Sequence, residues 1–363
     1  MGPPLGPPRE ESCYVADADL TSSANAALAW LLLQFLLCAV LIARAGFELS
    51  RSADRLAGLY GWGRGWVGLA LLATVTSLPE LASGISAVAL VDAPSLAVGN
   101  ALGACVVNLA FLVIVDALQR RQPMYRDASA THLLSAAFGV VMLGFVALSV
   151  LVGTRSPTLL HVGLYSPLLL GLYLLALRSV HALEWQALRA MSSGGAGSVQ
   201  QGTPPGAPRE WRRFGLAALL VLLAGIWLPE VADALAQALG LSRSFVGTVL
   251  MAVVTTLPEM AVTLSALRLG ALDMAIGNLL GSNLFNVMIL SIDDLFYTRG
   301  ALLAHVSMVH AGTAMTALIM SGLVIVGLVM RPQGRVLRVT SWVSIGLVSA
   351  YAINVALVYL SAG

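Results

Sequence analysis

Charged residues are scarce in this sequence, and one basic residue type is missing altogether. Only 10% of the 363 residues are charged, and all 20 basic residues are arginine, whereas about 25% of residues are charged in soluble domains. The arginines are scattered between apolar runs, which argues against a surface for nucleic acid. Hydrophobic residues make up 58% of the chain, and the mean hydropathy is +0.87. This composition predicts an integral membrane protein without a large extramembrane domain.

Cysteine is also rare, and its positions exclude two kinds of site. Cys13, Cys38 and Cys105 form no CxxC pair, so neither a disulfide framework nor a thiolate metal site is predicted. The sequence contains no HExxH, GxSxG or GxxxxGK motif, which argues against an intramembrane enzyme and against a cofactor. Residues 1–25 lack the basic and apolar regions of a cleaved signal peptide and are interpreted as a tail.

Ten apolar segments are each long enough to cross a bilayer as a helix, which takes about 20 residues. They form two sets of five around residues 191–212, a Gly/Ser/Pro-rich stretch interpreted as a flexible linker. The expected fold is an all-α polytopic membrane protein with five-helix halves over residues 26–190 and 213–363. The predicted segments are 26–45, 66–91, 95–118, 132–152, 158–180, 214–239, 245–267, 274–297, 302–330 and 336–360.

The arginines predict the orientation of the chain, because basic residues concentrate in loops on the cytoplasmic side. With ten spans, only Arg9, Arg155, Arg243 and Arg299 fall on the side opposite the linker. We therefore expect both termini outside and the linker in the cytoplasm.

The two halves share a repeated motif, residues 67–118 in the first and 246–296 in the second. The first 24 positions of the two copies are identical at 13 places, which is more than apolar bias alone gives. Each half has an odd number of spans, so the second copy must enter the membrane in the opposite sense. The sequence thus predicts two inverted-topology repeats, with a binding site where the copies meet.

A glutamate stands near the middle of one segment in each repeat, at Glu80 and Glu259. An ionisable group near the bilayer midplane costs at least ~2.5 kcal/mol, so it is a functional candidate by default. Two carboxylates ~6 Å apart at an effective dielectric of ~20 repel by about 3 kcal/mol, so we expect the pair to hold a proton or a cation. One Ca²⁺, two Na⁺ or two protons would neutralise the pair, and such mutually exclusive occupancy is a physical basis for exchange.

Each glutamate follows a proline, Pro79 or Pro258, which lacks a backbone N–H and leaves an earlier carbonyl without its helical partner. Hydroxyl side chains stand beside each break, on the face of the glutamate or next to it. Carboxylate, hydroxyl and carbonyl oxygens suit hard cations such as Na⁺ or Ca²⁺. The predicted hydroxyl ligands are Thr76, Ser77, Thr255 and Thr256. Hydrogen bonding of the threonines to the preceding turn is the alternative.

The next segment of each repeat carries a polar stripe with a spacing of four residues. The stripe consists of Asn278, Ser282 and Asn286 in the second copy and of Asn100, Ala104 and Asn108 in the first. Amide oxygens bind cations without adding charge, and polar contacts that hold helices together are the alternative.

Other acidic residues lie nearer the segment ends. Asp116, Asp293 and Asp294 are expected to be solvated at the membrane interface, with recruitment of cations to the entrance as the functional alternative. Glu230 and Asp233 share a helix face, and a role on the ion path is the weaker interpretation for them.

The segments TSLPEL and TTLPEM, followed by GNALGACVVN and GNLLGSNLFN, resemble the calcium/cation antiporter superfamily and most of all prokaryotic sodium/calcium exchanger-like proteins. The resemblance implies a ten-helix antiporter in which two glutamates, matched by Glu80 and Glu259, bind Ca²⁺ and Na⁺ alternately. It also implies that the first segment of each half slides past the rest. The further ligand positions that it implies are matched by Thr76, Ser77, Thr255, Thr256, Asn108, Ser282 and the backbone oxygens of Ala73 and Ala252.

The sequence departs from the family pattern at three positions. Ala104 and Cys105 replace a hydroxyl and an amide ligand, and Asn286 stands where sodium/calcium exchangers usually have an aspartate. Exchange of Ca²⁺ for Na⁺ is the main hypothesis, and Ca²⁺/H⁺ or another cation/H⁺ antiport is the alternative. A cation channel is less favoured, because this repeat completes a site within one chain. The expected partners are inorganic cations and the lipid bilayer of a prokaryotic plasma (inner) membrane, and the expected state is a monomer.

Overall fold

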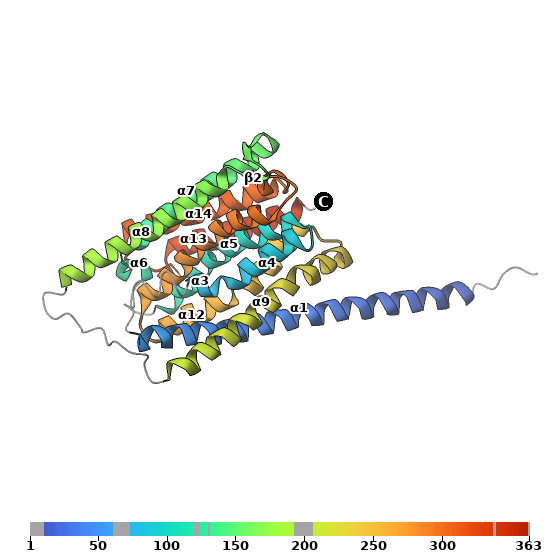
Figure 1. Cartoon of the computed structure of the whole chain (residues 1–363), viewed down its shortest axis with the longest axis horizontal. Coiled ribbons are helices and arrows are strands. Elements are labelled where there is room, and N and C mark those ends of the chain that lie inside the picture. Colours follow the sequence, from blue (N-terminus) through green and yellow to red (C-terminus); the bar gives the residue numbers. More distant parts are fainter. Residues whose placement is uncertain are drawn as a thin grey trace, which may run out of the picture.

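The computed structural model describes residues 11–60, 73–119, 123–129, 131–191, 206–336 and 339–361, and this part of the chain is almost entirely helical. Long helices run side by side in one bundle (Figure 1). Eight of the described helices are long and apolar enough to cross a membrane, and the bent pair Arg243–Thr255 and Leu257–Arg268 makes a ninth span. The predicted all-α polytopic fold is confirmed.

The first half follows the order of the predicted segments. Its long helices are α1 (Glu11–Leu59), α5 (Pro94–Leu118), α7 (Thr131–Val152) and α8 (Tyr165–Met191). Its shorter elements are α3 (Ala73–Thr76), α4 (Leu78–Ala89), α6 (Met124–Asp127), η2 (Gly153–Arg155), β1 (Thr158–Leu159) and β2 (Val162–Gly163). Helix α1 begins well before the predicted first segment, within the predicted tail. Residues 1–10 of that tail and 66–72 of the second predicted segment lie outside the described residues.

The second half repeats this arrangement. Its long helices are α9 (Ala207–Leu239), α13 (Leu272–Phe296), α14 (Val309–Met330) and α15 (Trp342–Leu360). Its shorter elements are α10 (Arg243–Phe245), η3 (Val246–Met251), α11 (Ala252–Thr255), α12 (Leu257–Arg268) and η4 (Leu302–Ala304). Most of the predicted linker, residues 192–205, lies outside the described residues.

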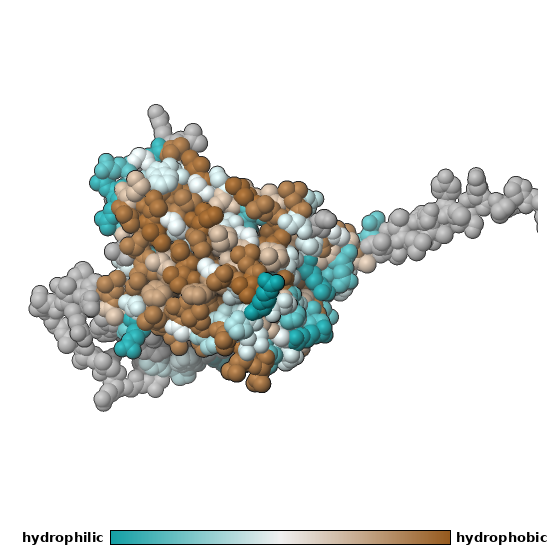
Figure 2. Space-filling view, turned by 90° about the horizontal axis from the view of Figure 1, so that it is seen from above, coloured by the Kyte–Doolittle hydropathy of each residue, from teal (hydrophilic) through white to brown (hydrophobic). Residues whose placement is uncertain are grey.

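Helices α5 and α13, which correspond to the third predicted segment of each half, lie at the centre of the bundle. In the most apolar window of each helix, 89% of the residues of α13 and 72% of those of α5 are buried, against 11% for α1. The outer helices expose large apolar side chains, among them Trp30, Leu36 and Leu223. Hydrophobic side chains cover most of the face seen in Figure 2. A surface of this kind is stable in contact with lipid, because its side chains are apolar and a helix pairs most of its backbone polar groups internally.

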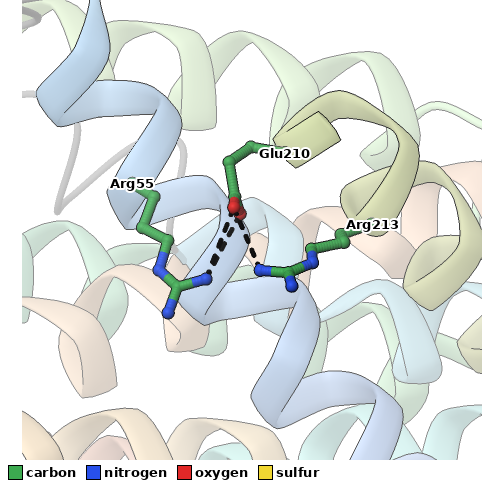
Figure 3. A network of polar contacts seen from close by, with 3 residues as sticks. All are labelled: Arg55, Glu210 and Arg213. Atoms are coloured by element: carbon green, nitrogen blue, oxygen red, sulfur yellow. Dashed lines mark hydrogen bonds and ion pairs between the residues drawn. The ribbon is translucent and has the colours of Figure 1, made fainter. Parts of the chain in front are cut away.

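The first helices of the two halves, α1 and α9, lie against each other along one side of the bundle (Figure 1). Glu210, at the start of α9, forms ion pairs with Arg55 of α1 at 3.4 Å and with Arg213 of its own helix at 3.1 Å (Figure 3). The three side chains are partly exposed, so the pairs contribute little stability. They join the end of α1 to the start of α9.

Three predicted segments begin too early. Helix α8 begins at Tyr165 rather than near residue 158, α14 at Val309 rather than 302, and α15 at Trp342 rather than 336. Strands β1 and β2 form a short antiparallel hairpin with Thr158 opposite Gly163. The physical reason is long-range, because two buried aspartates bind the backbone just before or beside these helix starts.

Asp294 of α13 is fully buried and accepts four hydrogen bonds. One comes from the following loop, from the Leu302 N–H at 2.6 Å. The others come from the start of α8 in the first half, from Gly163 N–H and Tyr165 O–H at 2.8 Å each and from the Ser166 hydroxyl. Asp294 therefore anchors the last helix of the other half, and the prediction that it is solvated at the interface is wrong.

Asp116 of α5, the equivalent residue in the first repeat, does the same for α15 and is also fully buried. It accepts hydrogen bonds from the Met124 N–H at 3.0 Å and from the Ser341 N–H at 2.7 Å. The hydroxyls of Thr340 and Ser344 each donate at 2.8 Å. The two repeats thus hold each other's final helices by the same device, and the solvated position predicted for Asp116 is also wrong.

Candidate functional site

Two broken helices from opposite repeats meet at the centre of the bundle. The break between α3 and α4 falls at Ser77 (φ −88°, ψ 13°), and the break between α11 and α12 falls at Thr256 (φ −81°, ψ 0°). Each break precedes the predicted proline, which occupies the first turn of the following helix. Proline is favoured there because its missing N–H has no helical partner in any case. The glutamate follows at once and lies in the same first turn.

Glu80 and Glu259 are buried, with 1% and 0% of their surface exposed. Neither carboxylate oxygen of Glu80 has a hydrogen-bond partner among the described residues, and Oε2 of Glu259 also has none. Oε1 of Glu259 accepts a hydrogen bond of 2.9 Å from the Ser77 hydroxyl of the other repeat. Ser77 stands three residues before Glu80 at the α3–α4 break, so this bond places the Glu259 carboxylate beside the turn that carries Glu80. The structure thus brings the two predicted carboxylates together in one buried place.

The predicted hydroxyl ligands differ in the hydrogen-bond partners that they already have. The Thr76 hydroxyl lies 3.4 Å from the Ser282 hydroxyl and also donates to the Ala73 carbonyl at 3.2 Å. The Thr256 hydroxyl donates to the Ala252 carbonyl at 2.7 Å, as in the alternative stated for the threonines. Both predicted backbone ligands, the carbonyls of Ala73 and Ala252, therefore already accept hydrogen bonds within their own helices.

Thr255 points across to the other repeat. Its hydroxyl donates to the amide oxygen of Asn100 at 3.0 Å, and the Asn100 amide donates to Ser83 at 2.8 Å. On the opposite side, the Asn278 amide donates to the Glu259 carbonyl and to Thr263, both at 3.2 Å. Asn100 and Asn278 belong to the predicted stripe and brace the helices through these bonds. Both atoms of the Asn100 amide are bonded, whereas the Asn278 oxygen has no hydrogen-bond partner among the described residues. Ser83 and Thr263 have no counterpart in the sequence prediction.

Asn108 and Asn286 differ from the bracing amides of the stripe. Both are fully buried, and neither the oxygen nor the nitrogen of either side chain has a hydrogen-bond partner among the described residues. Buried amides are nearly always hydrogen-bonded, so four unpartnered atoms at equivalent positions of two repeats point to a ligand. With Glu80 and Glu259 they form a set of unpartnered oxygens, which we call the central site.

Cys105, one of the departures from the family pattern, is bonded within the protein. Its thiol donates to the Asn283 carbonyl at 3.6 Å, and the Asn283 amide donates to the Cys105 carbonyl at 3.3 Å. These reciprocal bonds join α5 to α13 at equivalent positions of the repeats. In the part of the chain that the structure describes, no three His, Cys, Asp or Glu side chains gather at one place. A cation at the central site must therefore rely on two carboxylates and neutral oxygens.

Asp233 does not contribute to the central site. Its carboxylate binds Nε and Nη2 of Arg243 and the Gln237 amide, at the turn between α9 and α10. Glu230 is exposed. Neither residue lies with the two central glutamates. The ion pair with Arg243 accounts for the carboxylate at position 233.

Helix α5 packs so closely against η3 that Gly103 has no room for a side chain. A Cβ added at Gly103 would lie 2.3 Å from the Thr248 carbonyl oxygen and 2.8 Å from the Ala252 Cβ. The contact is made with backbone atoms, which cannot turn aside as a flexible side chain does. This glycine lets the two repeats approach at the depth of the central site.

We expect Gly103→Ala to destabilise the protein by about 1–3 kcal/mol, the usual cost of overpacking. The matched control is Gly144→Ala in α7, where the added Cβ would make an ordinary contact of 3.6 Å with Leu318. Thermal unfolding of both variants in detergent measures the difference. Equal melting temperatures would show that α5 and η3 can separate without cost.

A helical membrane fold of two inverted repeats, with buried oxygen-bearing side chains where the repeats meet, is typical of secondary transporters. The profile of the family described as sodium/calcium exchanger protein matches residues 30–179 and 211–360 of this chain. The chain therefore belongs to the sodium/calcium exchanger family, whose members are transporters of cations and not enzymes.

The chain is also similar in sequence to several named membrane proteins. The inner membrane protein YrbG of Escherichia coli is 27% identical over 247 residues, which are 64% of this chain and 72% of YrbG. The putative antiporter CaxA of Alkalimonas amylolytica is 30% identical over 233 residues, 61% of this chain and 66% of CaxA. The sodium/calcium exchanger MaX1 of Methanosarcina acetivorans is 39% identical over 83 residues, 23% of this chain and 24% of MaX1.

The fold is also that of a solved structure. The sodium-calcium exchanger NCX_Mj superposes with a TM-score of 0.59 at 22% sequence identity, over 90% of this chain and 97% of NCX_Mj. At this identity the similarity shows the fold, and the fold is the predicted one of two repeats.

Proposed function

We propose that this cation antiporter exchanges Ca²⁺ for Na⁺ by alternating access at the central site. The observation that carries the proposal is the set of buried oxygens without partners. Glu80 and Glu259 supply these oxygens from opposite repeats, and Asn108 and Asn286 supply unpartnered amide oxygens on the two central helices. Buried carboxylates without hydrogen bonds are costly unless they bind a cation.

The donor set fits hard cations. Ca²⁺ takes 6–8 oxygen ligands, at about 2.3–2.6 Å, from carboxylates, amides, hydroxyls and water. Two carboxylates give a formal charge of −2, which one Ca²⁺ or two Na⁺ neutralise. The hydroxyls of Ser77, Thr76 and Ser282 lie next to the glutamates or to each other and add neutral oxygens. The names of two relatives, the sodium/calcium exchangers MaX1 and NCX_Mj, support the same pair of ions.

A second candidate, Ca²⁺/H⁺ antiport, rests on the composition of the stripe. Asn286 adds no charge, and Ala104 adds no oxygen, so the central site offers fewer Na⁺ ligands than the family pattern. The decisive experiment is Ca²⁺ uptake into proteoliposomes at clamped membrane potential, driven by an outward Na⁺ gradient or by an outward H⁺ gradient. Uptake with Na⁺ alone supports the first candidate, and uptake with H⁺ alone supports the second. No uptake under either gradient contradicts both.

We also propose that the protein lies in a prokaryotic plasma membrane as a monomer, with both termini outside and the linker inside. The arginine distribution supports this orientation. Leu160, 90% exposed between β1 and β2, is then extracellular, and Gly334, between α14 and α15, is cytoplasmic.

We expect an impermeant maleimide to label Leu160→Cys in intact cells and Gly334→Cys only after permeabilisation. The three native cysteines are removed beforehand so that each variant carries one thiol. Labelling of Gly334→Cys alone in intact cells would establish the opposite orientation.

A further inference from the structure

Asp293 of α13 is a buried carboxylate to which no described residue donates a hydrogen bond. It is 0% exposed, and neither carboxylate oxygen accepts a hydrogen bond from any described residue. The adjacent Asp294, by contrast, accepts four. A buried carboxylate that lacks both donors and a counter-charge is strongly unfavourable, so it is expected to take up a positive charge. The interfacial, solvated position predicted for Asp293 is wrong.

The Asp293 side chain reaches the helix that carries Glu80. A Cβ added at Gly84 of α4 would lie 2.5 Å from Oδ2 and 2.6 Å from Oδ1 of Asp293, so the carboxylate rests against the backbone of α4 at a residue without a side chain. Gly84 is one helical turn beyond Glu80, on the same face. Asp293 is also two turns beyond Asn286 on α13, again on the same face. It therefore continues the line of unpartnered oxygens from the central site toward the α4–α5 turn.

The fold itself does not require a carboxylate at this position. Val115 is the equivalent residue in the first repeat, and it is 0% exposed. A buried apolar side chain thus fills the same place in the other half of the bundle. The asymmetry means that only one of the two paths away from the central site carries an acidic group here.

Other titratable side chains on the elements packed against this end of α13 do not neutralise Asp293. None of the hydrogen bonds and ion pairs that these groups form involves Asp293. Asp294 is bonded by four donors, among them Tyr165 of α8, and Arg299 pairs with Asp92 of the α4–α5 turn at 2.8 Å. His161 is bonded to the Leu295 carbonyl, His305 to the Ala301 carbonyl, and the Tyr297 ring lies against His305. Glu80 of α4 has no hydrogen-bond partner among the described residues.

We propose that Asp293 is a third cation-binding carboxylate, which takes up one Na⁺ or one proton on the path between the central glutamates and the α4–α5 turn. It supplies, two turns away, a negative charge that Asn286 does not provide. The proposal rests on the proposed function of the central site, because a third charge matters only if cations pass Glu80.

Cation-dependent stability of the purified full-length protein in detergent tests this assignment, because a ligand that binds the folded state raises the melting temperature. The melting temperature is measured against Na⁺ concentration at constant pH and ionic strength, against pH from ~5 to ~8 without Na⁺, and against Ca²⁺. The Na⁺ and pH series distinguish the two sources of positive charge at Asp293. The Ca²⁺ series reports on the central site.

If Asp293 binds Na⁺, Asp293→Asn should need at least tenfold more Na⁺ for the same shift in melting temperature. If Asp293 binds a proton, the variant should instead lose most of the dependence of the melting temperature on pH. Gly84→Ala should act in the same direction, because its Cβ displaces the carboxylate without changing the charge of the chain. The matched control is Asp92→Asn, which removes a half-exposed carboxylate at the α4–α5 turn that is paired with Arg299 at 2.8 Å. Its Na⁺ and pH series should match those of the wild type.

Wild-type Na⁺ and pH series in both Asp293→Asn and Gly84→Ala would overturn the proposal. Asp293→Val, patterned on Val115, replaces Asp293→Asn if that variant does not fold. Failure of the proposed function has a different signature, in which Ca²⁺ does not stabilise the wild type while the Na⁺ and pH series still report on Asp293. Glu80→Gln should lose the Ca²⁺ response and keep a response that depends on Asp293.

Discussion

Replacing either Glu80 or Glu259 by glutamine is expected to abolish Ca²⁺ exchange. The amide keeps the size of the side chain and removes one of the two negative charges that face the ion. A unit charge pair at 4 Å and an effective dielectric of 20 is worth about 4 kcal/mol, which corresponds to a roughly thousandfold loss of affinity. Ca²⁺ binding and Ca²⁺ flux in proteoliposomes should fall together.

Both glutamine variants should still fold, because a neutral amide is easier to bury than an unpartnered carboxylate. Glu230→Gln is the matched control, since Glu230 is an exposed residue of α9 next to Pro229, in a proline–glutamate pair like those of the central site. It should transport at the wild-type rate. Undiminished flux in both Glu80→Gln and Glu259→Gln would refute the central site as the place of ion binding.

Substitution of Asp294 by alanine is expected to cause the largest loss of stability, about 3–5 kcal/mol, because it leaves buried donors unpaired. Four donors from two separate loops converge on this carboxylate. Asp294→Asn should cost less, since its amide oxygen still accepts some of these bonds. Unfolding of the purified variants in detergent, followed by circular dichroism, measures both effects.

Asp116→Ala should behave like Asp294→Ala, because the two residues play equivalent roles in the two repeats. Asp92→Asn again serves as the control, since an exposed ion pair contributes at most ~1 kcal/mol. If Asp294→Ala were as stable as the wild type, the first turn of α8 would not depend on α13.

Features that depend on neighbours in the sequence were predictable. Glutamates recur within apolar segments directly after a proline, and that local pattern places Glu80 and Glu259 in the first turn of a broken helix wherever the rest of the chain lies. The confirmed fold class follows from segment length and from the repeat, which are also local properties. The pairing of Glu259 with Ser77 follows once the repeats are inverted, although no short-range pattern specifies it.

Features that depend on partners far along the chain were not predictable. Asp116, Asp293 and Asp294 all look like interfacial acids in the sequence. Asp116 and Asp294 are anchors with several donors each, whereas Asp293 has no hydrogen-bond partner in the part of the chain that the structure describes. The starts of α8, α14 and α15 were misplaced for the same reason, because the donors that Asp294 and Asp116 bind lie up to 228 residues away.

Apolar length, an odd number of predicted spans and duplicated motifs were enough to identify a helical membrane antiporter of two inverted repeats, because they require no knowledge of contacts. Tertiary structure alone decided which of its polar atoms are already bonded. Asn100 and Cys105 are bonded within the protein, whereas the side chains of Asn108, Asn286 and Asp293 have no partner among the described residues. The Asn278 amide donates two hydrogen bonds, but its oxygen accepts none from those residues. The physical reason is that a buried oxygen is available to a cation only when no donor from another helix reaches it, and that depends on how the helices pack.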